Sequence, residues 1–301
     1  MAVELADGAL AARKPEQVER FERLRSEFAE RYAAARAHDD PSLVEPEWHE
    51  RNAALEEALL PRPPLRFIEH PSIRCSMFLG DRCAPPELRY LAAAVGERRL
   101  ARLLEEDPIG GPPLLSEEVA GGHGPTSGNL VHHLHHLVRF GGETGVDVAG
   151  IDRVVEWGGG YGSLARLVAR VHRGGGPAYT IVDTPLFSAL QWLYLASVLG
   201  EDRVALHVDG PIEPAPGRVA VVPVGRFEDV PADAELFVST WALNESAPAA
   251  QDAVAAGRWF GARRLLMGMH RGAPLAGRAV ADGARVVPVG DFMPAQTYVV
   301  R

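Results

Sequence analysis

The sequence predicts an α/β protein with a doubly wound, mostly parallel sheet. A short apolar strand at residues 154–157 leads through a glycine-rich turn into a helix that begins at Ser163. A second apolar strand, at residues 178–183, follows that helix, and candidate strands and helices alternate from there to the C-terminus. Such alternation is typical of a parallel sheet covered by helices on both faces.

Length and pattern together predict the domain organisation. The chain of 301 residues suffices for one large α/β domain with an appended subdomain. Helical patterns dominate the first part of the chain, whereas strand patterns begin only after residue 150. We therefore expect an N-terminal helical subdomain over residues 1–125 and the sheet domain over residues 126–301.

Composition excludes several classes of partner. Forty acidic residues against 31 Lys and Arg give a net charge of -9, which argues against binding to a nucleic-acid backbone. No apolar run is long enough to span a bilayer. Cys75 and Cys83 are eight residues apart and form neither a disulfide framework nor a thiolate zinc motif. We expect a soluble cytoplasmic protein without a nucleic-acid or membrane partner.

Three amphipathic patterns predict helices in the N-terminal subdomain, at residues 15–37, 45–60 and 85–106. The first has an apolar stripe that runs from Val18 to Tyr32. This stripe needs a partner, and packing against neighbouring N-terminal helices is the favoured explanation. The alternative is a contact between two copies of the chain, which would make the protein a homodimer.

A proline- and glycine-rich segment over residues 107–128 predicts a long loop. Loops of this length inside a compact protein more often have a function than serve only as connections. Because the segment lies next to the sheet domain in the chain, we expect it to form a lid or to bind part of a substrate.

Four of the eleven histidines fall on a predicted helix at residues 129–140. At 100° per residue, His132, His135 and His136 lie opposite the leucines, with His133 at the boundary. Three explanations stay open: a solvated polar face, an acceptor surface that supplies a base, and a metal site. The sequence places no third Asp, Glu or Cys ligand beside the pair four residues apart, and H-E-x-x-H is absent, so we expect no metal.

The glycine turn after the first strand has the spacing E-x-G-x-G-x-G, from Glu156 to Gly162. A dinucleotide-binding turn requires G-x-G-x-x-G, and its third glycine would fall on Ser163. The turn ends at a helix N-terminus, whose free N–H groups favour a hydrogen-bond acceptor. Asp183, at the end of the second strand, suits the two hydroxyls of a ribose.

The remaining strands are predicted at residues 235–240, 264–269, 285–289 and 297–300, with the last two as an antiparallel pair. Residues 204–208 and 218–224 are both candidates for the third parallel strand, and we favour the second segment. Helices are predicted at 185–199 and 274–282, and from residue 246 to about 260.

The glycine turn resembles motif I of class I S-adenosylmethionine-dependent methyltransferases. Over residues 65–301 the chain is similar to the bacterial sugar O-methyltransferase family, through the turn, Val-Asp-Thr-Pro at 182–185 and Ser-Thr-Trp-Ala-Leu-Asn-Glu-Ser at 239–246. The resemblance implies a seven-stranded Rossmann-like sheet, S-adenosylmethionine as cofactor and S-adenosylhomocysteine as product. It assigns cofactor binding to Glu156, Gly158, Gly159, Gly160, Tyr161, Gly162, Asp183, Arg226, Phe227 and Thr240.

Methyl transfer to a hydroxyl needs a base that accepts the proton as the new bond forms. The candidates, in order, are Glu245, His136, His270 and His133. In O-methyltransferases of the plant and polyketide type a His-Asp pair follows the fourth strand, and Asn244 and Glu245 stand there instead. Glu245 could also cap the next helix, and His270 could be a solvated loop residue.

These predictions lead to one function. We expect an O-methyltransferase for a small polar metabolite, such as a sugar or a glycosylated natural product. N- or C-methylation of a small natural product, and a cofactor-binding scaffold without turnover, are the alternatives.

Overall fold

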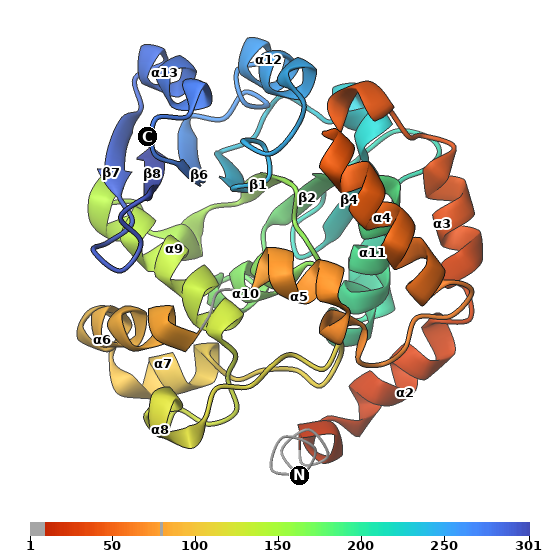
Figure 1. Cartoon of the computed structure of the whole chain (residues 1–301), viewed down its shortest axis with the longest axis horizontal. Coiled ribbons are helices and arrows are strands. Elements are labelled where there is room, and N and C mark those ends of the chain that lie inside the picture. Colours follow the sequence, from red (N-terminus) through yellow and green to blue (C-terminus); the bar gives the residue numbers. More distant parts are fainter. Residues whose placement is uncertain (1–9, 79–80) are drawn as a thin grey trace.

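A single sheet forms the centre of the protein. The structure, a computed structural model, describes residues 10–78 and 81–301. Its strands lie in the order β3-β4-β2-β1-β5-β6-β8-β7, and β8 is antiparallel to both of its neighbours (Figure 1). The strands are β1 (Arg153–Trp157), β2 (Ala178–Asp183), β3 (Val204–Leu206), β4 (Val219–Pro223), β5 (Leu236–Thr240), β6 (Arg264–His270), β7 (Arg285–Pro288) and β8 (Gln296–Val300). The predicted doubly wound sheet is confirmed.

The predicted number of strands was too low by one. Both candidates for the third parallel strand are strands: β4 pairs with β2, as favoured, and β3 pairs with the outer side of β4. The sheet therefore has eight strands in the described part of the chain instead of seven. The extra strand has only three residues.

Two apolar clusters cover the two faces of the sheet. Successive strand residues point to opposite faces, so Val154 belongs to one cluster and Val155 to the other. The first face is covered by α9 (Gly128–Thr144), α10 (Ser163–Val171) and α11 (Pro185–Leu199). The second is covered by α12 (Pro248–Ala256) and α13 (Pro274–Ala281).

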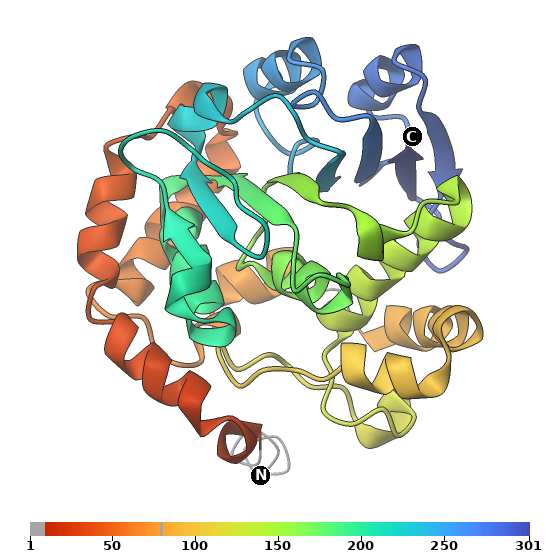
Figure 2. The ribbon, with the colours of Figure 1, turned by 180° about the vertical axis from the view of Figure 1, so that it is seen from behind.

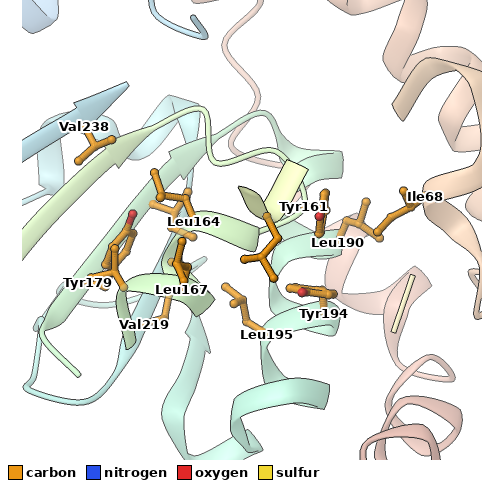
Figure 3. Packing of buried hydrophobic residues seen from close by; sticks show 14 of the residues in the cluster. Ile68, Tyr161, Leu164, Leu167, Tyr179, Leu190, Tyr194, Leu195, Val219 and Val238 are labelled. Atoms are coloured by element: carbon orange, nitrogen blue, oxygen red, sulfur yellow. The ribbon is translucent and has the colours of Figure 1, made fainter. Parts of the chain in front are cut away.

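The first cluster also includes the N-terminal part of the chain. Figure 3 shows Leu164 and Leu167 of α10, Leu190 and Leu195 of α11, and Ile68 of the N-terminal segment, which all belong to this cluster. The N-terminal helices and the sheet therefore share one continuous core.

The N-terminal helices differ from the predicted ones in two places. The expected helix at 15–37 is broken at residues 25–27, and the expected helix at 85–106 is broken at Gly96, whose φ is +81°. Gly96 ends the first piece at low cost because it lacks a Cβ. The helices are α2 (Pro15–Leu24), α3 (Phe28–Arg36), α4 (Pro46–Leu59), α5 (Pro71–Met77), α6 (Ala84–Val95), α7 (Glu97–Leu103) and the short α8 (Glu117–Ala120).

The apolar stripe of α2 and α3 is covered within the chain. Both helices pack against α11, and Phe21, Leu24 and Phe28 are fully buried. Figure 2 shows the two helices running along the outer side of α11. The partner of the stripe is thus a helix of the sheet domain rather than mainly other N-terminal helices. In the described residues no helix is long and apolar enough to cross a bilayer.

Candidate functional site

A cavity of about 330 Å³ lies at the carboxyl ends of the parallel strands. Ligands of doubly wound proteins bind at this edge of the sheet, where the loops after the strands converge. The end of β1 contributes Glu156, β2 contributes Asp183, β5 contributes Thr240 and β6 contributes His270. The cavity thus brings together residues that are more than 100 positions apart in the sequence.

The glycine turn forms the floor of the cavity and needs its glycines. Gly158 has a φ of +75°, and a Cβ at this position would lie 2.0 Å from the Cβ of Ala242. Its N–H donates to the carbonyl oxygen of Val182 at 2.8 Å, which ties the turn to β2. Gly158, Gly159 and Gly160 line the cavity. A larger residue would separate the turn from the segment that follows β5.

Glu156 is a buried carboxyl at the cavity wall. It is 1% exposed, and the hydroxyl of Tyr179 donates to its Oε2 at 2.8 Å. Burial raises the pKa of Glu156 to about 8. A cationic group in the cavity would therefore favour the ionised form and would in turn be attracted by it.

Asp183 is held by hydrogen bonds from two sides. The N–H of Thr184 donates to Oδ1 at 2.7 Å, and Nε2 of Gln191 donates to Oδ2 at 2.6 Å. The same Gln191 nitrogen donates to the carbonyl oxygen of Gly160 at 2.8 Å. Burial raises the pKa of Asp183 to about 7. Gln191 thereby connects the glycine turn to the second acidic residue of the cavity.

The structure brings most of the predicted cofactor residues together. Tyr161 and Thr240 line the cavity together with the glycine turn and the two acids. Gly162, Arg226 and Phe227 lie outside the lining. The Arg226 guanidinium donates to the carbonyl oxygens of His207 and Gly210, and the Phe227 ring lies edge-on to Trp157. Val224, two residues earlier, reaches the cavity from this segment.

The segment after β5 carries the first candidate base. Glu245 is half-buried in the cavity wall, which it lines together with Trp48, and burial raises its pKa. It does not cap the following helix, since α12 begins after Ala247 without a side-chain cap. His270 is exposed at the cavity rim, where its Nδ1 lies 3.0 Å from Nε2 of Gln296.

Trp241 holds this segment in place with an unusual backbone conformation. Its φ is +68°, which is strained for a residue with a Cβ, and strain of this kind is concentrated at functional sites. Its Nε1 donates to Oε1 of Gln296 at 2.7 Å. The indole ring packs 5.6 Å from the His132 ring and 5.5 Å from the His136 ring, measured between centroids.

The histidine face of α9 is not solvated. His132, His135 and His136 are 5%, 2% and 0% exposed, so the first of the three explanations, a solvated polar face, was wrong. The face is covered because α9 packs against α6, and β8 lies beside it. His132, His133 and His136 all line the cavity, whereas His135 does not.

The front wall of the cavity comes from segments that the sequence did not single out. Residues 43–45 with Trp48, and residues 75–78, line the cavity. Residues 107–128, all of them described, lie outside its lining, although they form the predicted long loop. The start of that loop is anchored instead: Asp107 forms ion pairs with Arg166, Arg170 and Lys14.

Several site residues could not be found from the sequence. Gln191, Tyr179 and Trp48 act through contacts with residues far away in the chain. One signal was present: Gln191 carries the one side-chain amide within the apolar cover of the predicted helix at 185–199. Such a residue needs a hydrogen-bond partner when it is buried.

No protein-family model matches this chain, and no curated sequence matches it significantly. Among solved structures it is similar to magnesium protoporphyrin IX methyltransferase from Synechocystis PCC 6803 with bound S-adenosylmethionine, at 12% identity, 74% coverage of this chain and 96% of that one, with a TM-score of 0.38. Fibrillarin from Aeropyrum pernix, solved in complex with S-adenosylmethionine, is 12% identical. The match covers 56% of this chain and 73% of that one, with a TM-score of 0.38. A mitomycin 7-O-methyltransferase is 17% identical, with 82% of this chain and 74% of that one covered, and its TM-score is 0.37. Because these sequence identities and TM-scores are low, a cofactor has to be assigned from the residues of the site itself.

Proposed function

We propose that this protein is an S-adenosylmethionine-dependent methyltransferase that methylates a hydroxyl of a small polar metabolite. The observation that carries the proposal is the pair of acids, the buried Glu156 and the partly buried Asp183, that line one cavity together with the glycine turn. The cofactor has a cationic amino group and a ribose diol, which are the two kinds of group that such carboxylates bind.

Unpartnered polar atoms in the cavity lining (Thr184 and Ser163) and directly behind it (Gln191) support this assignment. Thr184 Oγ1, Gln191 Oε1 and Ser163 Oγ are buried and have no hydrogen-bond partner within the described residues. Buried polar groups are nearly always hydrogen-bonded, so these atoms fit a polar ligand or ordered water. Thr184 and Gln191 both contact Asp183, at the position that we assign to the ribose.

For the chemical step we assign the base to Glu245. S-adenosylmethionine supplies a methyl group on a sulfonium, and the protein has to align the acceptor oxygen with it and exclude water. The half-buried carboxylate of Glu245 would accept the proton of the acceptor hydroxyl. Ala242, on the same turn, abuts Gly158, so the base is carried by a segment in direct contact with the glycine turn. His136, His270 and His133 are the further candidates.

The acceptor that we propose is a sugar or a glycosylated natural product. This choice follows the sequence resemblance, and the composition of the wall supports it. Trp48, Phe78, Phe187 and Trp241 offer apolar faces, and the histidines and Glu245 offer hydrogen-bonding groups. Ligands with both apolar faces and hydroxyls suit such a wall.

Calorimetric titration with S-adenosylmethionine tests the proposal. We expect binding by the intact protein, loss of binding in Asp183→Ala, and unchanged binding in Asp209→Ala, which removes an exposed acid outside the cavity. Absence of binding by the intact protein would refute the proposal, and binding of a nicotinamide dinucleotide instead would indicate a dehydrogenase.

A screen of acceptors with a labelled methyl donor then tests the reaction. Label on a hydroxyl oxygen is the expected result. Label on nitrogen or carbon would indicate the alternative methylations, and cofactor binding without any labelled product would favour a scaffold.

A further inference from the structure

A cluster of three imidazoles lies behind the cavity wall. His132, His135 and His136 follow the spacing i, i+3, i+4, which places them on one face of α9. Each offers one nitrogen, and these three atoms lie within 4.8 Å of one another. Nitrogens bound to one zinc ion at about 2.0–2.1 Å are separated by about 3.4 Å in a tetrahedral site. A small adjustment of side-chain torsions would therefore bring all three around one ion.

An acid from another helix lies against the cluster. Glu87 of α6 is fully buried, and its Oε1 contacts Nδ1 of His132 and lies 3.7 Å from Nδ1 of His135. Among the described residues, no Lys or Arg forms an ion pair with Glu87, and its Oε2 has no hydrogen-bond partner. A carboxylate in such surroundings lacks a compensating cation.

Two ring nitrogens of the cluster are also free to bind a ligand. Nε2 of His132 and Nε2 of His136 are buried and have no partner in the described part of the chain. The hydroxyl of Tyr298 lies 2.6 Å from Nδ1 of His136 and 3.2 Å from Nδ1 of His135. Hydrogen bonds from an outer group to ligating imidazoles are a regular feature of metal sites.

We propose that His132, His135 and His136 bind one divalent transition-metal ion of the zinc type, with Glu87 as the outer partner of His132. Three imidazoles suit Zn²⁺ or Co²⁺ better than Mg²⁺ or Ca²⁺, which prefer oxygen ligands. Three protein ligands leave one position of a tetrahedral site for water, and the contact of Glu87 with His132 would tie α6 to the site. The ion would thereby fix His132 and His136 in the cavity wall. The site does not depend on the proposed methyltransferase function.

The sequence predicted no metal because the third ligand beside His132 and His136 was missing. Glu87 is 45 residues away from His132 in the chain, and His135 had been placed on a polar face without a partner.

The test uses the full-length chain without a polyhistidine tag. The protein is stripped with a chelator and titrated with ZnCl₂ by calorimetry, and metal content is then measured by mass spectrometry. The expected result is one ion per chain. We also expect CoCl₂ to give the visible absorption of four-coordinate cobalt, and Zn²⁺ to raise the unfolding temperature reversibly. No cofactor or acceptor is needed.

Matched variants identify the ligands. His135→Gln, which removes a ligand, should lower the Zn²⁺ affinity by about 100-fold or more, and Glu87→Gln, which removes the outer partner of His132, should lower it by about 10–100-fold. His133→Gln removes a neighbouring imidazole that is not part of the cluster and should keep the affinity. Equal affinity in all three variants would overturn the proposal. So would a stripped intact protein that takes up no Zn²⁺, and this result does not depend on whether any variant folds.

Discussion

The amide of Gln191 and the carboxylate of Asp183 form a 2.6 Å hydrogen bond at the floor of the cavity, and the same amide nitrogen bonds to Gly160. Gln191→Ala should therefore weaken S-adenosylmethionine binding by about 10-fold, the equivalent of one net hydrogen bond to a charged group. Calorimetry measures the affinity. Ser197→Ala on the same helix is the control, because Ser197 Oγ bonds only to a carbonyl of its own helix. Equal affinity of the two variants would contradict the assigned role.

The buried carboxyl of Glu156 predicts a pH dependence of stability. Its pKa is about 8 in the folded protein against an ordinary value of 4.5, so the folded state holds a proton that the unfolded state has lost between these values. The contribution of Glu156 to the free energy of unfolding is fully present below pH 4.5 and declines as the pH rises towards 8.

Glu156→Gln should flatten this dependence. Denaturant unfolding without cofactor at several pH values between 5 and 8 should show a smaller decline for the variant than for the intact protein. Glutamine can still accept the hydrogen bond from Tyr179. Glu228→Gln, at an exposed position, should follow the intact protein. An identical pH profile for both variants would argue against a protonated Glu156.

Gly158→Ala should damage both stability and cofactor binding. Its Cβ would collide with that of Ala242, and a φ of +75° adds backbone strain of about 1–3 kcal/mol. The control is Gly122→Ala, whose φ is +80° but whose Cβ would meet no atom within 4 Å. A lower unfolding temperature in Gly158→Ala than in Gly122→Ala isolates the contact with the segment after β5. Equal unfolding temperatures of the two variants would mean that this contact does not contribute to stability.

Removal of the proposed base should lower turnover without loss of cofactor. Glu245→Gln keeps the size of the side chain, and we expect the methylation rate to fall by about 10²–10⁴-fold, as is usual for a lost general base. Affinity for S-adenosylmethionine should stay within error. Glu47→Gln removes an exposed acid near the same wall and is the matched control. A normal rate in Glu245→Gln would transfer the role to one of the histidines.

Asp107 should be important for stability rather than for activity. It is buried with Arg166, a fully buried guanidinium, and also pairs with Lys14 at 2.8 Å. Asp107→Asn leaves much of this positive charge uncompensated and should cost about 3–5 kcal/mol in the free energy of unfolding. Glu105→Gln, at a half-exposed carboxyl 3.4 Å from Lys14, should cost under about 1 kcal/mol. Denaturant titration measures both values.

The elements that the sequence located are those with a local pattern. β2 (Ala178–Asp183) was predicted to the residue, because a continuous apolar run ends in an acid between turn residues. The glycine turn and the start of α10 at Ser163 were located by the change from strand to helix period. The two helix breaks were missed because apolar positions continue across both of them, and only Gly96 marked one break.

What the sequence could not predict are contacts between distant positions. Asp107 and Arg166 are 59 residues apart, and neither local pattern indicates that the other is its partner. The histidine face was expected to meet water because helical periodicity shows which residues share a face, but not what covers it. Glu87 gave a weak signal, as an acid next to the apolar positions Leu88 and Leu91.

The shared core has a consequence for the order of events on the ribosome. Phe21, Leu24 and Phe28 lie on α2 and α3, which pack against α11, and α11 is translated about 150 residues later. A domain cannot complete its core before its last packing partner has emerged, and the chain grows by about 5–20 residues per second. The nascent N-terminal helices therefore spend roughly ten seconds or more with exposed apolar stripes, and during that interval they depend on chaperones or on transient contacts among themselves.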